Sequence, residues 1–359
     1  MKVSSMKTVA LSLPWRYPSR DVREPRINPV IVQLRTAEGL EGFGVCFSNN
    51  EGQVKSLKAC LDDLEDVVLG QDVFRFAEAW QKLWAATSKM GHQGYPIYAL
   101  AALDAALWML RAKALNLPLA TLLGGFREKV PVYASHYLWR YCTIDQLQKD
   151  AASLVKQGFR MMKMRMGAYP LPVELERYQA LREAVGNDVD IMVDLNWRCT
   201  VSEALKLGRE LDKRQVYWLE DPLASDDPEQ IAQVAAALDL PVVVGETYNH
   251  KYGFRTLLEK KATDIVMIDL QKVGGVTEWM RVANMAEAWN LPVVSHLFPD
   301  FSLHLVAAIP HGLVMEYLPW WDMIYQEPYT VKDGFIEVPK TPGIGLELDL
   351  KVLRKYALK

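Results

Sequence analysis

Apolar segments that each end in an acid or a histidine recur through the middle of the chain. They span residues 191–194, 217–220, 242–246, 265–269 and 293–296. Their last residues are 23 to 27 positions apart, which leaves room for one strand, one helix and two short loops. Because parallel strands need helical crossovers, the repeat predicts successive βα units, and eight such units close into a barrel. The terminal polar residues then lie at the carboxyl ends of the strands, where such barrels carry their catalytic groups.

The first third of the chain has a different pattern. Residues 2–13, 28–36 and 41–47 are apolar or alternating and contain β-branched side chains, which predicts a small antiparallel sheet. Residues 53–69, 75–87 and 97–115 carry apolar side chains at three- and four-residue spacing, which predicts helices. Strands followed by helices, without βα alternation, indicate a separate α+β domain.

A glycine-opened polar turn at residues 124–129 marks the expected boundary between these two regions. We therefore expect an α+β domain over residues 1–125, a barrel over 126–320 and a C-terminal segment over 321–359 that returns to the first domain. Within that segment, residues 334–338 and 346–350 read as short extended pieces that fold back on the first domain. The predicted fold class is α/β.

Composition narrows the functional classes. The 359 residues are 50% hydrophobic and 24% charged, which is typical of a soluble globular protein with a large buried core. Lysine and arginine total 41 against 44 acidic residues, and the net charge of −3 argues against partners such as nucleic acid or an anionic membrane. The cysteines have no paired short spacing, which argues against a zinc knot or a disulfide framework and favours a reducing, cytoplasmic location. No run of about 20 apolar residues is present to span a membrane.

Asp194, Glu220 and Glu246 end three consecutive predicted strands, so their side chains should converge at the rim of the barrel. Three carboxylates at one point repel one another unless a cation lies between them, and an oxygen-only set of ligands favours Mg²⁺. The alternative is that each acid merely caps the helix that follows its strand. Three acids at matched spacing favour the metal site.

His296 and Asp269 end neighbouring predicted strands. A carboxylate that accepts one imidazole N–H orients the ring and raises its basicity, as a general base near neutral pH requires. Lys163 and Arg165 are two positions apart on the second predicted strand, so they point to the same side. A lysine there can stabilise negative charge or transfer a proton, whereas an arginine is a poor base.

These positions together resemble the mandelate racemase subgroup of the enolase superfamily, over nearly the whole chain. The resemblance is carried by Lys163-Met164-Arg165, Asp194-Leu195-Asn196, Glu220-Asp221-Pro222, Gly245-Glu246, Asp269, His296 and Glu316. It implies a (β/α)7β modified TIM barrel with an N-terminal α+β capping domain, and Mg²⁺ on the three acids. It also implies His296, paired with Asp269, as the base and Glu316 as a hydrogen-bond donor to the substrate carboxylate. Such sites use a Lys or His base with Mg²⁺ to stabilise an enediolate.

Two positions separate the chain from other branches of that superfamily. The muconate-cycloisomerase branch has a lysine where this chain has Asp269. The racemase pattern has a second lysine, the base opposite the histidine, where this chain has Arg165. A reaction with one base is therefore favoured, namely dehydration of a sugar acid to a 2-keto-3-deoxy acid. A racemase or epimerase of an α-hydroxy acid is the alternative, and a non-enzymatic scaffold is disfavoured because the ligand residues and the His–Asp pair are all present.

Substrate-binding residues are expected in the loops at the barrel mouth. The resemblance places Asn196 there. Trp320 follows the last predicted strand and either lines the site or packs under the first domain. Residues 15–26 include Arg16 and Arg20 and either cover the mouth or form a solvated surface loop. The expected partner is a small-molecule hydroxy-carboxylate substrate, and a homo-oligomer is expected.

Overall fold

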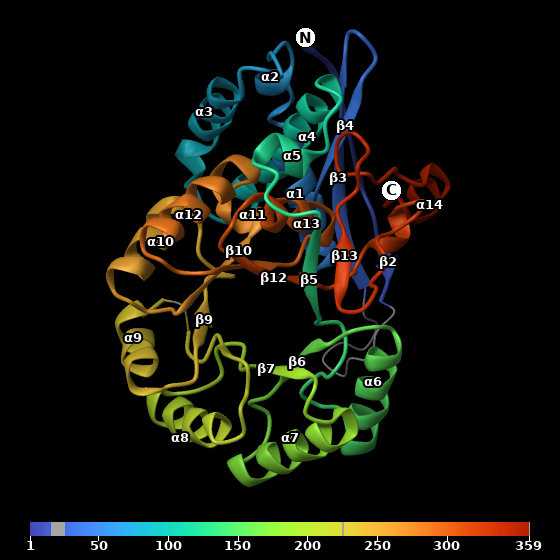
Figure 1. Cartoon of the computed structure of the whole chain (residues 1–359). Helices are drawn as coiled ribbons and strands as arrows, with labels where there is room; N and C mark the ends of the chain where they lie inside the picture. Colours follow the sequence, from blue (N-terminus) through green and yellow to red (C-terminus); the bar gives the residue numbers. More distant parts are fainter. Residues whose placement is uncertain (16–25, 225, 359) are drawn as a thin grey trace.

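The computed structural model describes residues 1–15, 26–224 and 226–358, and it places an antiparallel sheet with helices against a closed barrel (Figure 1). The strands of the first domain are β1 (Val3–Ala10), β2 (Leu13–Pro14), β3 (Arg26–Thr36) and β4 (Glu41–Ser48). Its helices are α1 (Glu51–Asp62), α2 (Glu65–Val68), α3 (Phe76–Thr87), the 3-10 helix η1 (Ser88–Met90), α4 (Tyr95–Ala114) and α5 (Leu119–Leu123). The central strand is β3, which pairs antiparallel with the other strands of this sheet.

Helix α4 is the buried helix of the first domain. Its apolar residues lie all round the helix rather than along one stripe, and every side chain from Ala99 to Ala112 is buried, including those of Asp104 and Arg111. One side packs on β4, where a Cβ at Gly44 would lie 1.9 Å from the Ala102 carbonyl oxygen, so only glycine allows the approach. The other side packs against α11 (Leu270–Val273) of the barrel. This helix therefore joins the first domain to the barrel.

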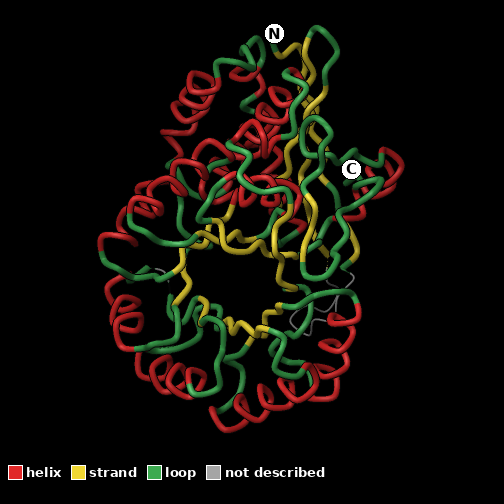
Figure 2. Tube along the Cα trace, in the orientation of Figure 1, coloured by secondary structure: helices red, strands yellow, loops and turns green. Residues whose placement is uncertain are grey.

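Strands β5 to β12 are paired in chain order, all parallel, and β12 pairs back with β5 to close the barrel. Their bounds are β5 (Lys129–Ala134), β6 (Met161–Arg165), β7 (Asp190–Asp194), β8 (Leu219–Glu220), β9 (Val242–Val244), β10 (Ile265–Asp269), β11 (Val293–His296) and β12 (Gly312–Tyr317). Besides α11, the crossover helices are α6 (Ile144–Lys156), α7 (Leu171–Val185), α8 (Val201–Asp212), α9 (Pro228–Ala237), α10 (His250–Glu259), α12 (Val276–Ala288) and α13 (Pro299–Ala308). Figure 2 shows the strands as an inner ring and the helices as an outer ring, so the chain folds as a (β/α)7β barrel.

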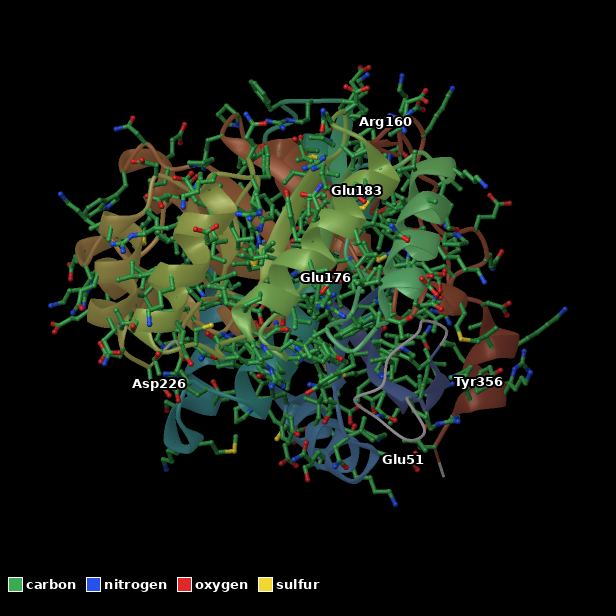
Figure 3. The ribbon with its side chains drawn as sticks, turned by 90° about the horizontal axis from the view of Figure 1, so that it is seen from below. Glu51, Arg160, Glu176, Glu183, Asp226 and Tyr356 are labelled. Carbon is green, nitrogen blue, oxygen red and sulfur yellow. The ribbon has the colours of Figure 1, made fainter. Side chains whose placement is uncertain are left out.

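Helix α7 has some of its charged residues on the side away from the strands, although it also buries Glu174 and Arg177. On α7, Glu176 and Glu183 are two turns apart and exposed, and Figure 3 shows both on this helix in the view from below. Tyr178 and Leu181 of the same helix are buried. Burial of the apolar side against the strands holds such a helix in place.

Apolar side chains fill the inside of the barrel below the polar residues. This layer consists of Tyr133, Met192, Trp218, Val243, Ile265, Met267, Val294 and Val314. Side chains two positions apart on a strand point to the same side, so Met192 and Asp194 share the inner face. The same relation links Trp218 to Glu220, Met267 to Asp269, Val294 to His296 and Val314 to Glu316. Strand geometry thus directs these polar groups to one end of the barrel.

Glu246 departs from this alternation because it lies three positions after Val243. The intervening Gly245 has a φ of 144°, and a Cβ there would lie 2.1 Å from the Met267 carbonyl oxygen. Only glycine fits this conformation and this space. The resulting change in backbone direction brings Glu246 to the cavity at the end of the barrel.

The C-terminal segment contains η2 (Asp322–Ile324), β13 (Phe335–Glu337) and α14 (Leu350–Tyr356). Strand β13 pairs antiparallel with β5, so the expectation that residues 334–338 fold back on the first domain is wrong. The pairing is available because β5 contacts β6 only near Ala134, which leaves the start of β5 with a free edge. The last residues do reach the first domain, where Ala357 bridges Leu11. The domain limits at residues 125 and 320 stay predictions.

One predicted helix is divided. The helix expected over residues 53–69 forms α1 and α2, because Leu64 leaves helical geometry with a ψ of 2° and buries its side chain in the core of the first domain. In the part of the chain that the structure describes, no helix is both long enough and apolar enough to cross a membrane.

Candidate active site

A cavity of about 370 Å³ lies at the carboxyl ends of the barrel strands, against the first domain. The charged groups on its barrel side are Lys163, Arg165, Asp194, Glu246, Lys272 and His296. The first domain lines it with Phe47, Ser48, Asn49, Gln53, Tyr95 and Tyr98. Among the described residues, the barrel therefore provides the charged groups, and the first domain provides a polar, uncharged and aromatic wall.

Lys163 lies at the centre of the acidic residues. Its Nζ is 2.6 Å from Glu220 Oε1, 2.9 Å from Glu316 Oε1 and 3.4 Å from Asp194 Oδ2, and its side chain is 1% exposed. Burial lowers the pKa of Lys163, but the carboxylates of Glu220, Glu316 and Asp194 outweigh it and raise the pKa above its ordinary value. An ammonium group held in this way donates hydrogen bonds and is a poor proton acceptor.

Arg165 is held by hydrogen bonds and by stacking. Its Nη1 donates to the Ser135 carbonyl oxygen at 2.8 Å, and its Nη2 donates to Ser135 Oγ at 3.0 Å. Its Nε lies 3.7 Å from Asp194 Oδ2, and its guanidinium carbon lies 3.9 Å from the centre of the Trp139 ring. A guanidinium in such a fork is a fixed donor and not a base.

His296 contacts two carboxylates. Its Nδ1 is 2.7 Å from Asp269 Oδ2, and its Nε2 is 3.1 Å from Glu246 Oε2. Asp269 is itself held, because its Oδ1 accepts a hydrogen bond from the Lys272 backbone N–H at 2.7 Å. Burial lowers the pKa of His296, but the charges of Glu246, Glu316 and Asp269 raise it to about 9. The ring is therefore both oriented and made more basic than a free imidazole.

Glu316 accepts hydrogen bonds in this structure. Its Oε2 accepts from the Leu297 backbone N–H at 2.7 Å, and its Oε1 faces Lys163. Burial raises the pKa of Glu316, but Lys163 and His296 outweigh it and lower the pKa below its ordinary value. The donor role that the resemblance implies requires a protonated carboxyl group, so these surroundings favour the opposite, ionised form.

The acids expected to bind Mg²⁺ reach the same end of the barrel but pair with different cations. Asp194 and Glu220 contact Lys163, and Glu246 contacts His296. Consequently, among the described residues, no group of three His, Cys, Asp or Glu side chains is close enough to hold a metal ion. Each carboxylate instead lies against the nearest positive side chain, because opposite charges attract strongly in a buried site.

The chemistry of these residues still fits a divalent cation. Glu220 and its neighbour Asp221 are buried, and burial together with the surrounding carboxylates raises the pKa of both. Such an excess of buried acid is relieved by a cation that takes oxygen ligands, of which Mg²⁺ is the usual example at carboxylates.

Asn196 orients a carboxylate as well as lining the cavity. Its backbone N–H donates to Asp194 Oδ1 at 2.8 Å and its Nδ2 donates to Asp194 Oδ2 at 2.9 Å, while its Oδ1 accepts from Arg140. The residue has a φ of 41°, a conformation that asparagine tolerates better than most residues. This conformation lets one residue donate to both oxygens of Asp194.

Trp320 lines the cavity within an aromatic group. Its ring centre is 5.3 Å from that of Trp15 and 5.5 Å from that of Phe47, so it both lines the site and packs against the first domain. The predicted substrate residues Arg16 and Arg20 lie outside the described residues.

The sequence assigned no role to Ser135 or Lys272, and it showed Asp221 only as part of the Glu220-Asp221-Pro222 motif. Ser135 follows Tyr133 by two positions and so faces inward, where it holds Arg165. Asp221 is buried beside Glu220, and its Oδ2 accepts from Trp197 Nε1 at 2.8 Å. Lys272 lines the cavity three positions after Asp269. Their place in the sequence could have identified them, since all three lie at or just after the end of a barrel strand.

Comparison with protein families agrees with this arrangement. Residues 8–124 match the mandelate racemase / muconate lactonizing enzyme N-terminal domain, and residues 146–352 match the enolase C-terminal domain-like family. The chain therefore belongs to the mandelate racemase and muconate lactonizing enzyme family of the enolase superfamily, and it is an enzyme of that superfamily.

Individual relatives cover most of the chain. An arabinonate dehydratase from Saccharolobus solfataricus is 30% identical, over 92% of this chain and 91% of the relative. A 3,6-anhydro-alpha-L-galactonate cycloisomerase from Streptomyces coelicolor is 31% identical, over 92% and 91%. The crystal structure of L-talarate dehydratase from Polaromonas sp. JS666, complexed with Mg and L-glucarate, has a TM-score of 0.93 and 28% identity, over 100% of this chain and 98% of that one.

Proposed function

We propose that this enzyme is a Mg²⁺-dependent acid-sugar dehydratase that converts a sugar acid to a 2-keto-3-deoxy acid. The observation that carries the proposal is the difference between the two sides of the cavity. His296 is an oriented imidazole whose pKa the neighbouring carboxylates raise to about 9, whereas Lys163, whose pKa is raised above its higher ordinary value, and Arg165 are held as cations by carboxylates and by Ser135. One competent base suits an elimination and does not suit racemisation by two opposed bases.

Asp194, Glu220 and Glu246 are the residues that would hold Mg²⁺. When bound, this ion supplies positive charge that stabilises the anion formed as the substrate loses its α-proton. Among relatives, the Polaromonas L-talarate dehydratase is complexed with Mg, which supports the choice of metal. Asn196 would keep Asp194 in place through its two hydrogen bonds.

The protein groups divide the proton transfers between them. His296 Nε2 removes the proton from the α-carbon, and Asp269 holds the ring and stabilises the resulting imidazolium. The β-carbon then loses its hydroxyl, protonated by that imidazolium or by Lys163, so the C–O bond breaks and water leaves. The enol that remains becomes the 2-keto acid. Lys163 and Arg165 donate hydrogen bonds that hold the substrate oxygens in place, and Trp320 closes the cavity beside them.

A panel of mono- and dicarboxylic sugar acids, screened with Mg²⁺ for 2-keto acid formation, tests the proposal. We expect at least one acid to be dehydrated, with no turnover after the metal is removed by a chelator and recovery when Mg²⁺ is returned. Proton NMR in D₂O tests for the alternative reaction, epimerisation at the α-carbon. If a deuterated epimer formed faster than the 2-keto acid, the enzyme would be an epimerase and not a dehydratase. A homo-oligomer remains a prediction that solution molecular mass would test.

A further inference from the structure

Lys272 is a charged residue of the cavity that the reaction described above does not use. It lies on the short helix α11, and two hydrogen bonds hold the first turn of this helix in place. The Lys272 backbone N–H donates to Asp269, and the side-chain oxygen of the adjacent Gln271 accepts from the Phe47 backbone N–H at 2.8 Å. Packing of α11 against α4 adds to this support. The position from which the Lys272 side chain starts is therefore well defined.

The side chain of Lys272 lines the cavity as a cation, and no described residue is a directly bound counter-ion to it. In the chain outside residues 16–25, 225 and 359, no carboxylate lies within ion-pair distance of its ammonium group, in contrast to Lys163 with its close carboxylates. Burial lowers the pKa of Lys272, but Asp269 and Glu246 act at longer range and raise the pKa above its ordinary value. Lys272 thus stays charged and keeps its donors for a group that enters the cavity.

The neighbouring wall indicates what kind of group that is. Ser48, Gln53 and Tyr95 form a chain of hydrogen bonds, with Tyr95 Oη 3.0 Å from Gln53 Oε1 and 3.2 Å from Ser48 Oγ. Hydroxyl and amide groups of this kind exchange hydrogen bonds with the hydroxyls of a sugar chain and carry no charge to attract a carboxylate. Among the described residues on this side of the cavity, Lys272 is the group suited to an anion.

We propose that Lys272 binds a second carboxylate of the substrate, so that the enzyme selects dicarboxylic over monocarboxylic sugar acids. This rests on the proposed function, because the first carboxylate is the one at the reacting end, near Lys163. An ammonium–carboxylate hydrogen bond in a partly buried site is about twice as strong as one to a neutral hydroxyl. A terminal carboxylate therefore gains more from Lys272 than the terminal hydroxymethyl group of the matching monoacid.

Matched ligand pairs test this selection by binding rather than by turnover. Galactarate with galactonate, and glucarate with gluconate, differ in whether carbon 6 is a carboxylate or a hydroxymethyl group. Calorimetric titration in Mg²⁺ should show the wild-type protein binding one diacid at least about tenfold more tightly than its monoacid partner. In Lys272→Met, diacid affinity should fall by about 10- to 100-fold and monoacid affinity by less than about threefold.

Two further variants separate charge from structure. Lys272→Arg should keep the preference for the diacid, because it keeps a cation at this position. Lys55→Met, which removes an exposed lysine of α1, should leave both affinities unchanged. Melting temperatures of all variants should match the wild type. Equal loss of both ligands in Lys272→Met, a wild-type preference for monoacids, or binding of neither member of any pair would each overturn the proposal. Diacid binding without 2-keto acid formation would instead reject the dehydratase and retain the role of Lys272.

Discussion

Both sides of the active-site cavity carry basic side chains beside carboxylates, but these side chains differ in burial and in the number of carboxylates that they contact. On one side, His296 is 11% exposed and contacts Asp269 and Glu246. On the other, Lys163 is 1% exposed and contacts carboxylates of three different strands, while Arg165 is stacked on Trp139. A cation enclosed by acids is stabilised as a cation and loses its capacity to accept a proton. His296 is also paired with carboxylates, but its pKa of about 9 stays below that of Lys163, which is raised above an already higher ordinary value, so His296 releases its proton more readily and is the expected base.

Two other histidines of the barrel show that the neighbouring carboxylates, and not burial, raise the pKa of His296. His136 and His304 are buried, and burial lowers the pKa of each to about 4. At His296 burial acts in the same direction, but the neighbouring acids reverse it and raise the pKa to about 9. The same side chain thus has opposite shifts within one fold, depending on which strand ends surround it.

The largest expected effect comes from removing a carboxylate on the Lys163 side of the cavity. Glu220→Gln keeps the volume of the side chain but removes an anionic group that contacts Lys163 and that is proposed to bind Mg²⁺. We expect Mg²⁺ affinity, measured by calorimetric titration, to fall more than about 100-fold, since groups behind metal ligands alone contribute 10- to 100-fold. Turnover should be undetectable. Glu176→Gln on the outer face of α7 is the control, and unchanged turnover in Glu220→Gln would rule out this ligand.

Asp269→Asn tests the His296 side alone. The amide oxygen can still accept from the Lys272 backbone N–H, but the carboxylate that orients the imidazole and stabilises its charged form is lost. We expect kcat to fall by about 10⁴-fold, as in other His–Asp pairs, with an unchanged melting temperature. Asp226→Asn at the exposed surface serves as the comparison (Figure 3). Rates at the wild-type level in Asp269→Asn would show that His296 is not the base.

Arg165→Lys tests whether the opposite side can be turned into a base. The substitution removes the fork that donates twice to Ser135 and the stacking on Trp139, so we expect dehydration to fall by about tenfold. Proton NMR in D₂O should show no inverted, deuterated product from either protein, because the new ammonium also lies beside Asp194. Appearance of that product in the wild type would contradict the one-base interpretation.

The smallest expected effect concerns stability and the buried histidines. His304 has a pKa of about 4 in the folded chain, below its ordinary value of 6.5, so the unfolded chain binds more protons between these pH values. Its contribution is fully present above pH 6.5 and is lost as the pH falls toward 4. Urea unfolding at pH 7.5, 6.0 and 5.0 should show the free energy of unfolding falling with pH. The His304→Gln side chain can still donate a hydrogen bond to the Ile344 carbonyl oxygen. In this variant the decrease in the free energy of unfolding with falling pH should be smaller by a few kcal/mol at most, because one pKa unit corresponds to about 1.4 kcal/mol. An equal fall in both proteins would contradict the assignment.

The sequence by itself determined which residues reach the active end of the barrel. Strand alternation and the βα interval placed Asp194, Glu220, Asp269 and His296 there, because a period of two and a minimum crossover length are properties of local backbone geometry. The same local rule explains why Lys163 and Arg165 share one face. It also identified the family, since the order of these groups along the chain is itself distinctive.

Apart from the His296–Asp269 pair, which the sequence predicted, only the tertiary structure decided how these groups pair. Lys163 meets Glu316, which is far from it in the chain, because closure of the barrel brings β12 beside β5, the strand next to β6. Glu246 turns inward through the conformation of Gly245 and the closeness of Met267, neither of which follows from strand alternation. The free edge of β5 and the side-chain surroundings of Lys272 likewise do not follow from the sequence pattern. Pairing depends on distances between residues that are remote in sequence. A local pattern predicts the direction in which a side chain points, but it does not predict which residues that side chain will contact.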